Sequence, residues 1–268
     1  MTETITVPQL PRRVIITMND KSCGKTLLQQ LIGDVCLRSN QSMEFFHSDT
    51  QSYLSVYGTS QTIALADTAE LIADSAADVE RHEPLLQAFK TLPGRSDHVI
   101  GYDTGAGTLK RVAKVLDIVR CNERVRAAGA GILVLVPVTA REDIVEAAGE
   151  AISLATRVLP DATIVIAVSQ RDGDPGRFEK THQFWKLVAA ADDRLDLPRV
   201  SQDMLLLMRE SRRPICELAD PQGPASTETL AAELGLSEAR TELMRSTAAM
   251  LINVIDEAAP RLGFTLNV

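Results

Sequence analysis

The 268-residue sequence predicts an α/β fold, in which a doubly wound, mostly parallel sheet is flanked by helices. Three observations indicate this class. Short runs of β-branched and other apolar residues alternate with longer segments whose apolar residues recur at helical spacing. Two of the short runs, 131–136 and 162–168, are almost continuously apolar, as strands buried on both faces of a parallel sheet are. Aromatic residues make up only 4% of the chain, which suits aliphatic helices packed on such a sheet.

The first half of the chain contains three predicted strands. They lie at 14–18, which is rich in β-branched residues, at 42–47 and at 98–102. Residues 1–12 are polar and contain proline, so a flexible arm is expected there, and the Ser/Thr/Tyr/Gly-rich segment 52–66 is expected to be a mobile loop. Apolar residues at helical spacing predict helices at 27–37, 67–77, 83–92 and 109–127.

The second half continues the alternation. Strands are expected at 131–136, where Pro137 would end the strand, at 162–168 and, more weakly, at 195–200. Helices are expected at 141–159, 178–191, 203–209 and 237–262, with a Pro/Gly loop at 218–227.

The end of the chain has a second possible interpretation. Residues 229–240 have the look of a helix-turn-helix with Gly235 at the turn. The helix after this turn is too long and too apolar for a small DNA-reading head, so 237–262 is interpreted as a closing helix packed on the sheet. Residues 1–268 are therefore expected to form one domain.

The composition excludes several classes of protein. A formal net charge of −8 speaks against broad coating of nucleic acid, although it is compatible with a local basic patch. The four cysteines are widely spaced and form no C-x-x-C, which indicates reduced thiols in a cytoplasmic protein. The N-terminus has no signal-peptide pattern, and no run approaches the roughly 18 apolar residues of a membrane span.

The segment between the first strand and the first helix carries the clearest chemistry. It reads N-D-K-S-C-G-K-T from Asn19 to Thr26, the spacing of a phosphate-binding P-loop with Asn at the first glycine position. Asn tolerates left-handed backbone better than most residues. Gly24 lets the backbone approach phosphate, Lys25 would reach the β- and γ-phosphates, and the Thr26 hydroxyl would ligate Mg²⁺. The expected nucleotide-binding residues here are Asn19, Asp20, Lys21, Ser22, Cys23, Gly24, Lys25, Thr26 and Leu27.

Four loops are expected to meet at one edge of the sheet. In doubly wound sheets the ligand site lies outside the carboxyl ends of the strands. This rule brings the P-loop together with 49–51, 103–107 and 137–139. The expected site therefore combines the phosphate-binding loop with two acidic residues, Asp49 and Asp103.

Taken together, these segments resemble the ParA/MinD family of P-loop ATPases, which have a deviant Walker A motif. The family's N-D-K-G-G-x-G-K-T is matched by N-D-K-S-C-G-K-T, which is one residue shorter. Its D-x-D-P-Q motif is matched in part by H-S-D-T-Q at 47–51. Its D-[TS]-P-[AP]-G motif is matched by D-T-G-A-G at 103–107, and its strand ending in P-[VT]-x by L-V-L-V-P-V-T at 133–139. The matches span nearly the whole chain.

The resemblance implies roles for individual residues and a requirement for ATP and Mg²⁺. Lys25 and Asp49 would be catalytic, with Asp49 orienting the attacking water. Thr26, Asp49 and Asp103 would surround the metal. Ser169 and Gln170 stand where the family has an Asn that reads adenine. Without the resemblance, Asp49 could equally cap a helix or a turn.

One position departs from the family. Its signature lysine reaches the phosphates of a partner in a nucleotide-sandwich dimer. Counting back from Lys25 places Asp20 there, whereas aligning on N-D-K places Lys21 there, and both alternatives stay open. A carboxylate near the phosphates would be repulsive, which would affect dimerisation or hydrolysis.

The resemblance also implies a function and partners. The first hypothesis is a Mg-ATP switch that forms a homodimer, hydrolyses slowly, and positions or transfers a cargo such as plasmid DNA in partition or conjugation, with a cargo or adaptor protein. Non-specific DNA binding would use Arg209, Arg212 and Arg213, which could instead be a solvated helix end. No MinD-like membrane anchor is seen. The alternatives are a dethiobiotin-synthetase-like ATP-dependent ligase and a nucleotide-binding regulator that does not hydrolyse ATP.

Overall fold

The structure is a computed structural model that describes residues 10–48, 53–220, 223 and 226–266. Within these residues one sheet of seven parallel strands has the order β3-β2-β4-β1-β5-β6-β7. The strands are β1 (Arg12–Thr17), β2 (Ser42–His47), β3 (Thr59–Thr62), β4 (His98–Asp103), β5 (Gly131–Val138), β6 (Thr163–Ser169) and β7 (Asp193–Leu197).

Helices connect the strands and cover both faces of the sheet. Because every connection joins parallel strands, the chain must cross over the sheet between them. The helices are α1 (Lys25–Arg38), α2 (Thr68–Ala73), α3 (Ala77–Arg81), α4 (Glu83–Thr91), α5 (Leu109–Ile118), α6 (Cys121–Ala127), α7 (Glu142–Val158), α8 (Gln183–Ala190), α9 (Gln202–Glu210), α10 (Ile215–Ala219), α11 (Thr227–Leu234) and α12 (Glu238–Ala258).

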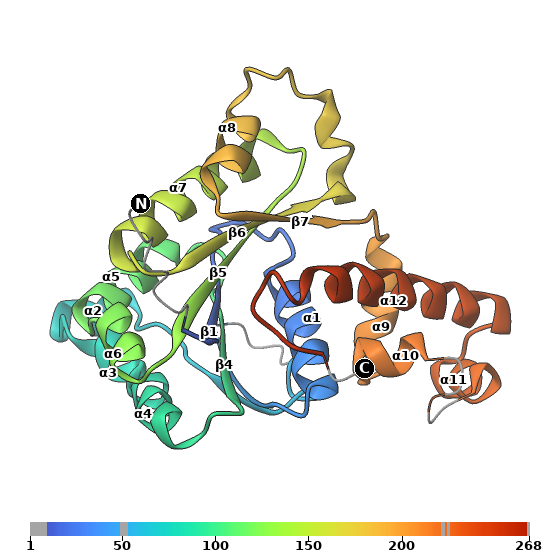
Figure 1. The fold of residues 1–268 in the computed structure, drawn as a ribbon, viewed down its shortest axis with the longest axis horizontal. Coiled ribbons are helices and arrows are strands. Elements are labelled where there is room, and N and C mark those ends of the chain that lie inside the picture. Colours follow the sequence, from blue (N-terminus) through green and yellow to red (C-terminus); the bar gives the residue numbers. More distant parts are fainter. Residues whose placement is uncertain (1–9, 49–52, 221–222, 224–225, 267–268) are drawn as a thin grey trace, which may run out of the picture.

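The sheet separates two apolar cores (Figure 1). On one face α1 packs with α9, α10, α11 and α12 around residues such as Leu31 and Leu251. On the other face α3 to α8 pack around residues such as Val112 and Ile144. Side chains alternate between the two cores along the central strand β1, because successive residues of a strand point to opposite faces.

The predicted α/β class and the parallel sheet are confirmed, and six of the strands lie where the sequence predicts them. The closing helix is α12, within the predicted range 237–262. The flexible arm predicted for 1–12 lies largely outside the described residues, and the part from Arg12 onward belongs to β1.

Several boundaries were predicted wrongly, each for a local reason. The segment 52–66 contains the strand β3, which is polar because it is an exposed edge strand. The helix predicted for 109–127 is two helices, since Arg120 adopts a left-handed φ of 51° between them. Pro137 does not end β5, because the strand continues to Val138 beside β6.

Two further helical boundaries differ from the prediction. The helix α8 begins only at Gln183, where the His182 side chain accepts a hydrogen bond from Phe184 N and caps it. The short helix α10 ends at Ala219, so the first two residues of the loop predicted at 218–227 are helical. Hydrogen bonds at these two helices, such as Phe184 N to His182 and Cys216 N to Asp34, cannot be predicted from the spacing of apolar residues.

Candidate nucleotide-binding site

The loop between β1 and α1 is held by the side chain of Asn19. Asn19 is buried, its Nδ2 donates to Pro137 O at 2.9 Å, and its Oδ1 accepts from Lys21 N at 2.8 Å. Asn19 is not among the residues with positive φ, so the left-handed backbone that Asn tolerates is not used at this position. The amide instead joins the loop to β5 and closes the turn, which a glycine could not do.

Gly24 supplies the left-handed residue of the loop. Its φ is 107°, it forms the N-cap of α1, and a Cβ placed on it would meet no heavy atom within 4 Å. Glycine is therefore required here for its backbone conformation and not for close packing. The conformation turns the chain so that α1 begins at the carboxyl end of the sheet, where its N-terminal amides favour an anion.

A buried carboxylate lies beside the start of α1. Asp103 ends β4 and is in register with Thr17 of the neighbouring strand β1. Its Oδ1 accepts from Thr17 Oγ1 at 2.8 Å and its Oδ2 from Thr26 Oγ1 at 2.6 Å. Burial raises the pKa of Asp103, while the two hydroxyls and Lys25 act in the opposite direction. A cation near Thr26 would stabilise the charged form of this carboxylate.

The ammonium group of Lys25 lies inside the loop. Lys25 is only 6% exposed, and its Nζ donates to Lys21 O at 2.7 Å. A loop carbonyl is a weak partner for a buried ammonium, since a negatively charged oxygen forms a stronger hydrogen bond with it. The side chain is thus held where an anion at the start of α1 could replace the carbonyl.

Two adjoining cavities follow the loop. The first has a volume of about 160 Å³, and the acidic strand end at Asp103 forms part of its wall. The second, of about 220 Å³, has more apolar walls that include Leu27 and Leu197. The residues that line both cavities are Ser22, Cys23, Gly24 and Arg209. The two cavities thus form a polar compartment at the P-loop and a more apolar compartment beside it.

Asp20 is hydrogen-bonded to the segment at the start of α5. Its Oδ1 accepts from Leu109 N and its backbone O accepts from Gly107 N, both at 3.0 Å. The carboxylate therefore binds the start of α5, and neither Asp20 nor the exposed Lys21 is among the residues lining the two cavities. Because the signature lysine acts on the phosphates of a partner, the choice between Asp20 and Lys21 for that position stays a prediction.

The end of β6 contributes an arginine that the sequence did not single out. Ser169 lines the apolar cavity, whereas the exposed Gln170 does not. The next residue, Arg171, lines this cavity, donates through Nη1 to Ser22 O at 3.0 Å, and pairs with Asp172 at 2.9 Å. In the sequence, Arg171 could have been recognised as an arginine that stands shortly after a buried apolar strand and is followed by an aspartate.

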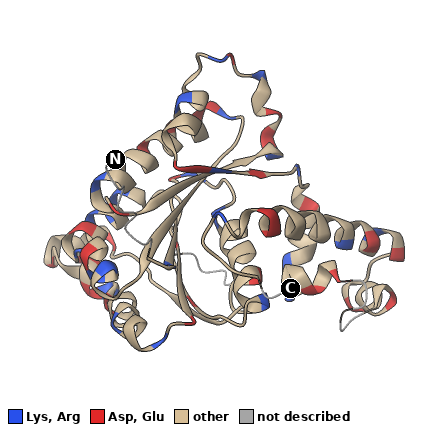
Figure 2. Ribbon diagram, viewed as in Figure 1, with Lys and Arg blue, Asp and Glu red and all other residues tan. Residues whose placement is uncertain are grey.

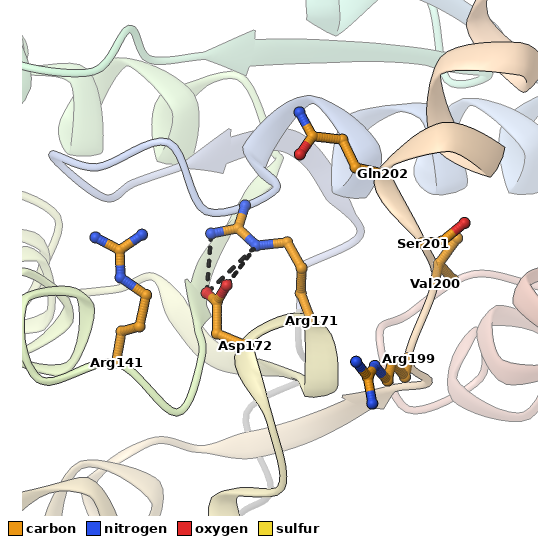
Figure 3. A pocket seen from close by; sticks show the side chains of 7 residues that line it. All are labelled: Arg141, Arg171, Asp172, Arg199, Val200, Ser201 and Gln202. Carbon is orange, nitrogen blue, oxygen red and sulfur yellow. Dashed lines mark hydrogen bonds and ion pairs between the residues drawn. The ribbon is translucent and has the colours of Figure 1, made fainter.

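Arg171 also separates this site from a larger basic cavity (Figure 3). That cavity has a volume of about 640 Å³ and lies beyond the ends of β5, β6 and β7. Arg141, Arg171 and Arg199 contribute three positive charges to its walls, and Asp172 contributes one negative charge. Arg171 therefore lines both this cavity and the apolar cavity of the nucleotide site, whereas Asp172 lines only the larger one.

Of two further predicted site residues, one lies outside the described residues and the other is buried. Asp49 lies outside the described residues, so its catalytic and metal-binding roles stay predictions. Cys23 is buried against the loop, and burial raises the pKa of its thiol to about 11. A thiol that stays protonated at neutral pH is a small apolar filler and not a reactive group.

The three arginines proposed for DNA binding lie in different surroundings. Arg213 forms ion pairs with Glu217 and Glu233, Arg212 is exposed, and Arg209 lines both nucleotide-site cavities. Acidic and basic residues alternate along the helices on both sides of the sheet (Figure 2). DNA binding by these residues stays a prediction.

Two kinds of feature are absent from the described residues, namely a cluster of metal-ligating side chains and a membrane-spanning helix. Within the described residues, no three His, Cys, Asp or Glu side chains form a group that could hold a metal ion. In the described part of the chain, none of the helices has both the length and the apolar run needed to cross a membrane.

Comparisons with known proteins return similarities of structure only. The sequence matches no family model and none of the curated proteins. Among solved structures, the chain is similar to the cell division protein MinD of Aquifex aeolicus, with 15% identity and a TM-score of 0.49 over 84% of this chain and 98% of that chain. It is also similar to McdA of Cyanothece in complex with ATP, with 14% identity and a TM-score of 0.45 over 85% and 98%.

A plasmid partition protein of Borrelia burgdorferi is a third similar structure. It has 14% identity and a TM-score of 0.40 over 72% of this chain and 91% of that chain. With TM-scores of 0.40 to 0.49 and identities of 14% to 15%, these likenesses carry no part of the argument, and the function is argued below from this chain's own residues.

Proposed function

We propose that the chain is a ParA/MinD-like molecular switch that binds Mg-ATP at the P-loop, dimerises in the ATP-bound form and hydrolyses ATP slowly. It would use this cycle to position, partition or transfer a cargo such as plasmid DNA, together with a cargo or adaptor protein. The observation that carries the proposal is the convergence of Lys25, Thr26 and Asp103 on one small cavity at the start of α1.

The residues present fit a nucleotide with its metal. Lys25 holds a buried ammonium against a carbonyl that a phosphate oxygen could replace, and Gly24 gives the backbone its left-handed turn. Thr26 and Asp103 provide hydroxyl and carboxylate oxygens, which are the ligand types that Mg²⁺ prefers. The adjoining cavity, with Leu27 and Leu197 in its wall, suits the flat apolar faces of a base.

The chain's own residues would bind and orient the nucleotide. Mg-ATP, when bound, supplies a transferable γ-phosphoryl group whose charge the metal partly neutralises. Lys25 would exchange the Lys21 carbonyl for phosphate oxygen. Asp103 would keep the Thr26 hydroxyl oriented by accepting its proton in a hydrogen bond, so that the hydroxyl lone pairs face the cavity.

The decisive experiment is titration of the purified chain with ATP and Mg²⁺ by calorimetry. We expect binding that Lys25→Ala weakens by about 100-fold or more, since a buried charge-assisted contact to phosphate is lost. Lys110→Ala is the matched control, because Lys110 is exposed and pairs only with Glu150 on the surface. Equal binding by wild type and Lys25→Ala would refute the proposal.

Dimerisation and turnover need separate measurements. Light scattering after gel filtration should show a mass near twice 29.1 kDa with ATP and Mg²⁺ and a monomer without nucleotide. ATP hydrolysis should be slow and should rise on addition of DNA or a partner. Tight ATP binding without measurable hydrolysis would instead identify the non-hydrolysing regulator.

A further inference from the structure

The last turn of α9 brings Arg209 to the nucleotide site. The helix lies on the same side of the sheet as α1 (Figure 1) and begins at Gln202, after Ser201, whose side chain caps it by accepting from Met204 N. Arg209 lines the 160 Å³ cavity together with Lys25 and Thr26. It also lines the adjoining 220 Å³ cavity, so it spans the polar and the apolar compartments. Among the described residues outside the P-loop, Arg209 alone lines both.

The guanidinium group of Arg209 is held in place by Tyr53. The Cζ atom of Arg209 lies 4.8 Å from the centre of the Tyr53 ring, which is the geometry of a cation–π contact. Tyr53 lines the 160 Å³ cavity as well. A stacked guanidinium keeps its planar N–H donors available at its edge, because the ring occupies only its face.

Arg209 has unused hydrogen-bonding capacity. Its Nε is buried and has no hydrogen-bond partner in the described part of the chain. A buried donor without a partner is uncommon in folded proteins, and here the donor belongs to a side chain that lines the cavity beside Lys25. By contrast, Arg213, on the segment that follows the same helix, is already engaged with Glu217 and Glu233.

The charged residues around the polar cavity also favour an anionic ligand. Lys25 and Arg209 provide two positive charges there, and Asp103 provides one negative charge. The carboxylate of Asp20 accepts a hydrogen bond from Leu109 N at the start of α5 and does not line the cavity. Among the described lining residues positive charge therefore exceeds negative charge, and half of the cationic charge comes from a helix far from the P-loop in sequence.

We propose that Arg209 binds the polyphosphate of the nucleotide within the same chain, as a second cation opposite Lys25, and that Tyr53 is a positioning residue for its guanidinium. This inference rests on the proposed function and deepens it. It assigns to Arg209 a ligand of defined chemistry, a nucleoside polyphosphate, in place of the DNA contact that the sequence suggested. The arginine acts in cis, so its contribution does not require a second copy of the chain.

The test is calorimetric titration of Arg209 variants with ATP and Mg²⁺. Arg209→Gln should weaken ATP binding by about 10- to 100-fold, which is the usual range for hydrogen bonds to a charged group. Arg209→Lys keeps the charge but not the planar fork, so it should recover part of the affinity. Arg212→Asn is the matched control, because it removes a positive charge at an exposed position and Asn tolerates the φ of 50° there.

A second readout separates phosphate binding from a structural role. Removing a cation that touches the phosphates should lessen the dependence of ATP affinity on salt concentration, whereas a loss of packing should leave it unchanged. For the positioning residue, Tyr53→Leu should weaken ATP binding about threefold or more, and Tyr53→Phe should restore most of it, since the contact with Arg209 is made by the ring.

The outcomes distinguish the two proposals. If wild type binds ATP in a Lys25-dependent manner, while Arg209→Gln binds with the same affinity and salt dependence, the inference about Arg209 is overturned and the proposed function stands. If wild type itself does not bind ATP, both fail. If Arg209→Gln and Arg212→Asn weaken ATP binding equally, the effect is one of general charge and Arg209 has no specific contact.

Discussion

The two ends of α1 carry buried polar residues in very different surroundings. At its N-terminus, Lys25 and Thr26 face a cavity, and Lys25 Nζ donates to a carbonyl of its own loop. In the last turns of the helix, Asp34 is enclosed: its Oδ1 accepts from Cys216 N at 2.9 Å and its Oδ2 from Tyr57 Oη at 3.3 Å. The Tyr57 hydroxyl in turn accepts from Ile215 N at 3.1 Å.

The comparison shows that burial of a charged group does not by itself identify a functional site. Burial raises the pKa of both Asp34 and Asp103. Asp34 is surrounded by donors from distant parts of the chain and lines none of the cavities described above, so its role is to attach α10 and the 53–57 segment to α1. Asp103 adjoins a cavity and could accept a ligand. The following changes test that distinction.

The largest effect should come from the titration of Asp34. Its pKa is raised to about 7 from an ordinary value near 4, so the folded state binds a proton that the unfolded state has released. The stabilisation is complete below about pH 4 and is lost as the pH rises to about 7, amounting to on the order of 4 kcal/mol.

Urea unfolding between about pH 4.5 and pH 7.5 measures this dependence. Asp34→Asn is the reference, since it retains the acceptor for Cys216 N without a titrating group, and the buried histidines His82 and His98 contribute equally to both proteins. Parallel stability curves for the two proteins over this range would contradict the assignment.

Removing the Asp34 side chain altogether should destabilise the fold by about 3 kcal/mol at pH 5, because two buried donors lose their acceptor. These are Cys216 N and the Tyr57 hydroxyl. Chemical unfolding of Asp34→Ala measures the loss. ATP affinity should change by less than about twofold, since the network lies outside the nucleotide cavities. A large loss of ATP affinity in a folded variant would contradict this expectation and would show that the Asp34 network contributes to nucleotide binding.

Asp103→Asn should show the opposite pattern. Stability should change by less than about 1 kcal/mol, since Asn can still bond the Thr17 and Thr26 hydroxyls and the desolvated charge is gone. ATP affinity in Mg²⁺ should fall by about 10- to 100-fold, roughly 1.4 to 2.8 kcal/mol, the usual effect of losing a group that orients a metal ligand. Titration in EDTA is the control, where wild type and variant should agree.

The smallest effect should come from Arg38→Ala in the last turn of α1. Arg38 pairs with Asp256 of α12, and the two side chains are 26% and 35% exposed. A partly exposed ion pair contributes about 1 kcal/mol, and high salt should lower that value. A double-mutant cycle with Asp256→Ala isolates the pair, and a coupling energy near zero would show that packing alone joins α12 to α1.

The sequence predicts the arrangement of the site better than its details, and the reason is physical. Parallel strands carry their loops to one edge, so a motif after β1 and an aspartate after β4 had to meet. Thr17 and Asp103 are register partners, which no local pattern reveals. The hydrogen bond from Leu109 N to Asp20 spans 89 positions, and the stacking of Arg209 on Tyr53 depends on how α9 packs. Such contacts follow from tertiary packing and leave no periodic signal.

Asp20 has a mechanical consequence for the P-loop. Its backbone carbonyl and its carboxylate accept hydrogen bonds from Gly107 and Leu109, so the loop and the first turn of α5 are joined at two points. Asp20 can shift only if the segment at the start of α5 shifts with it or if both bonds break. A ligand that displaced Asp20 would therefore also act on α5, which packs on the face of the sheet opposite α1.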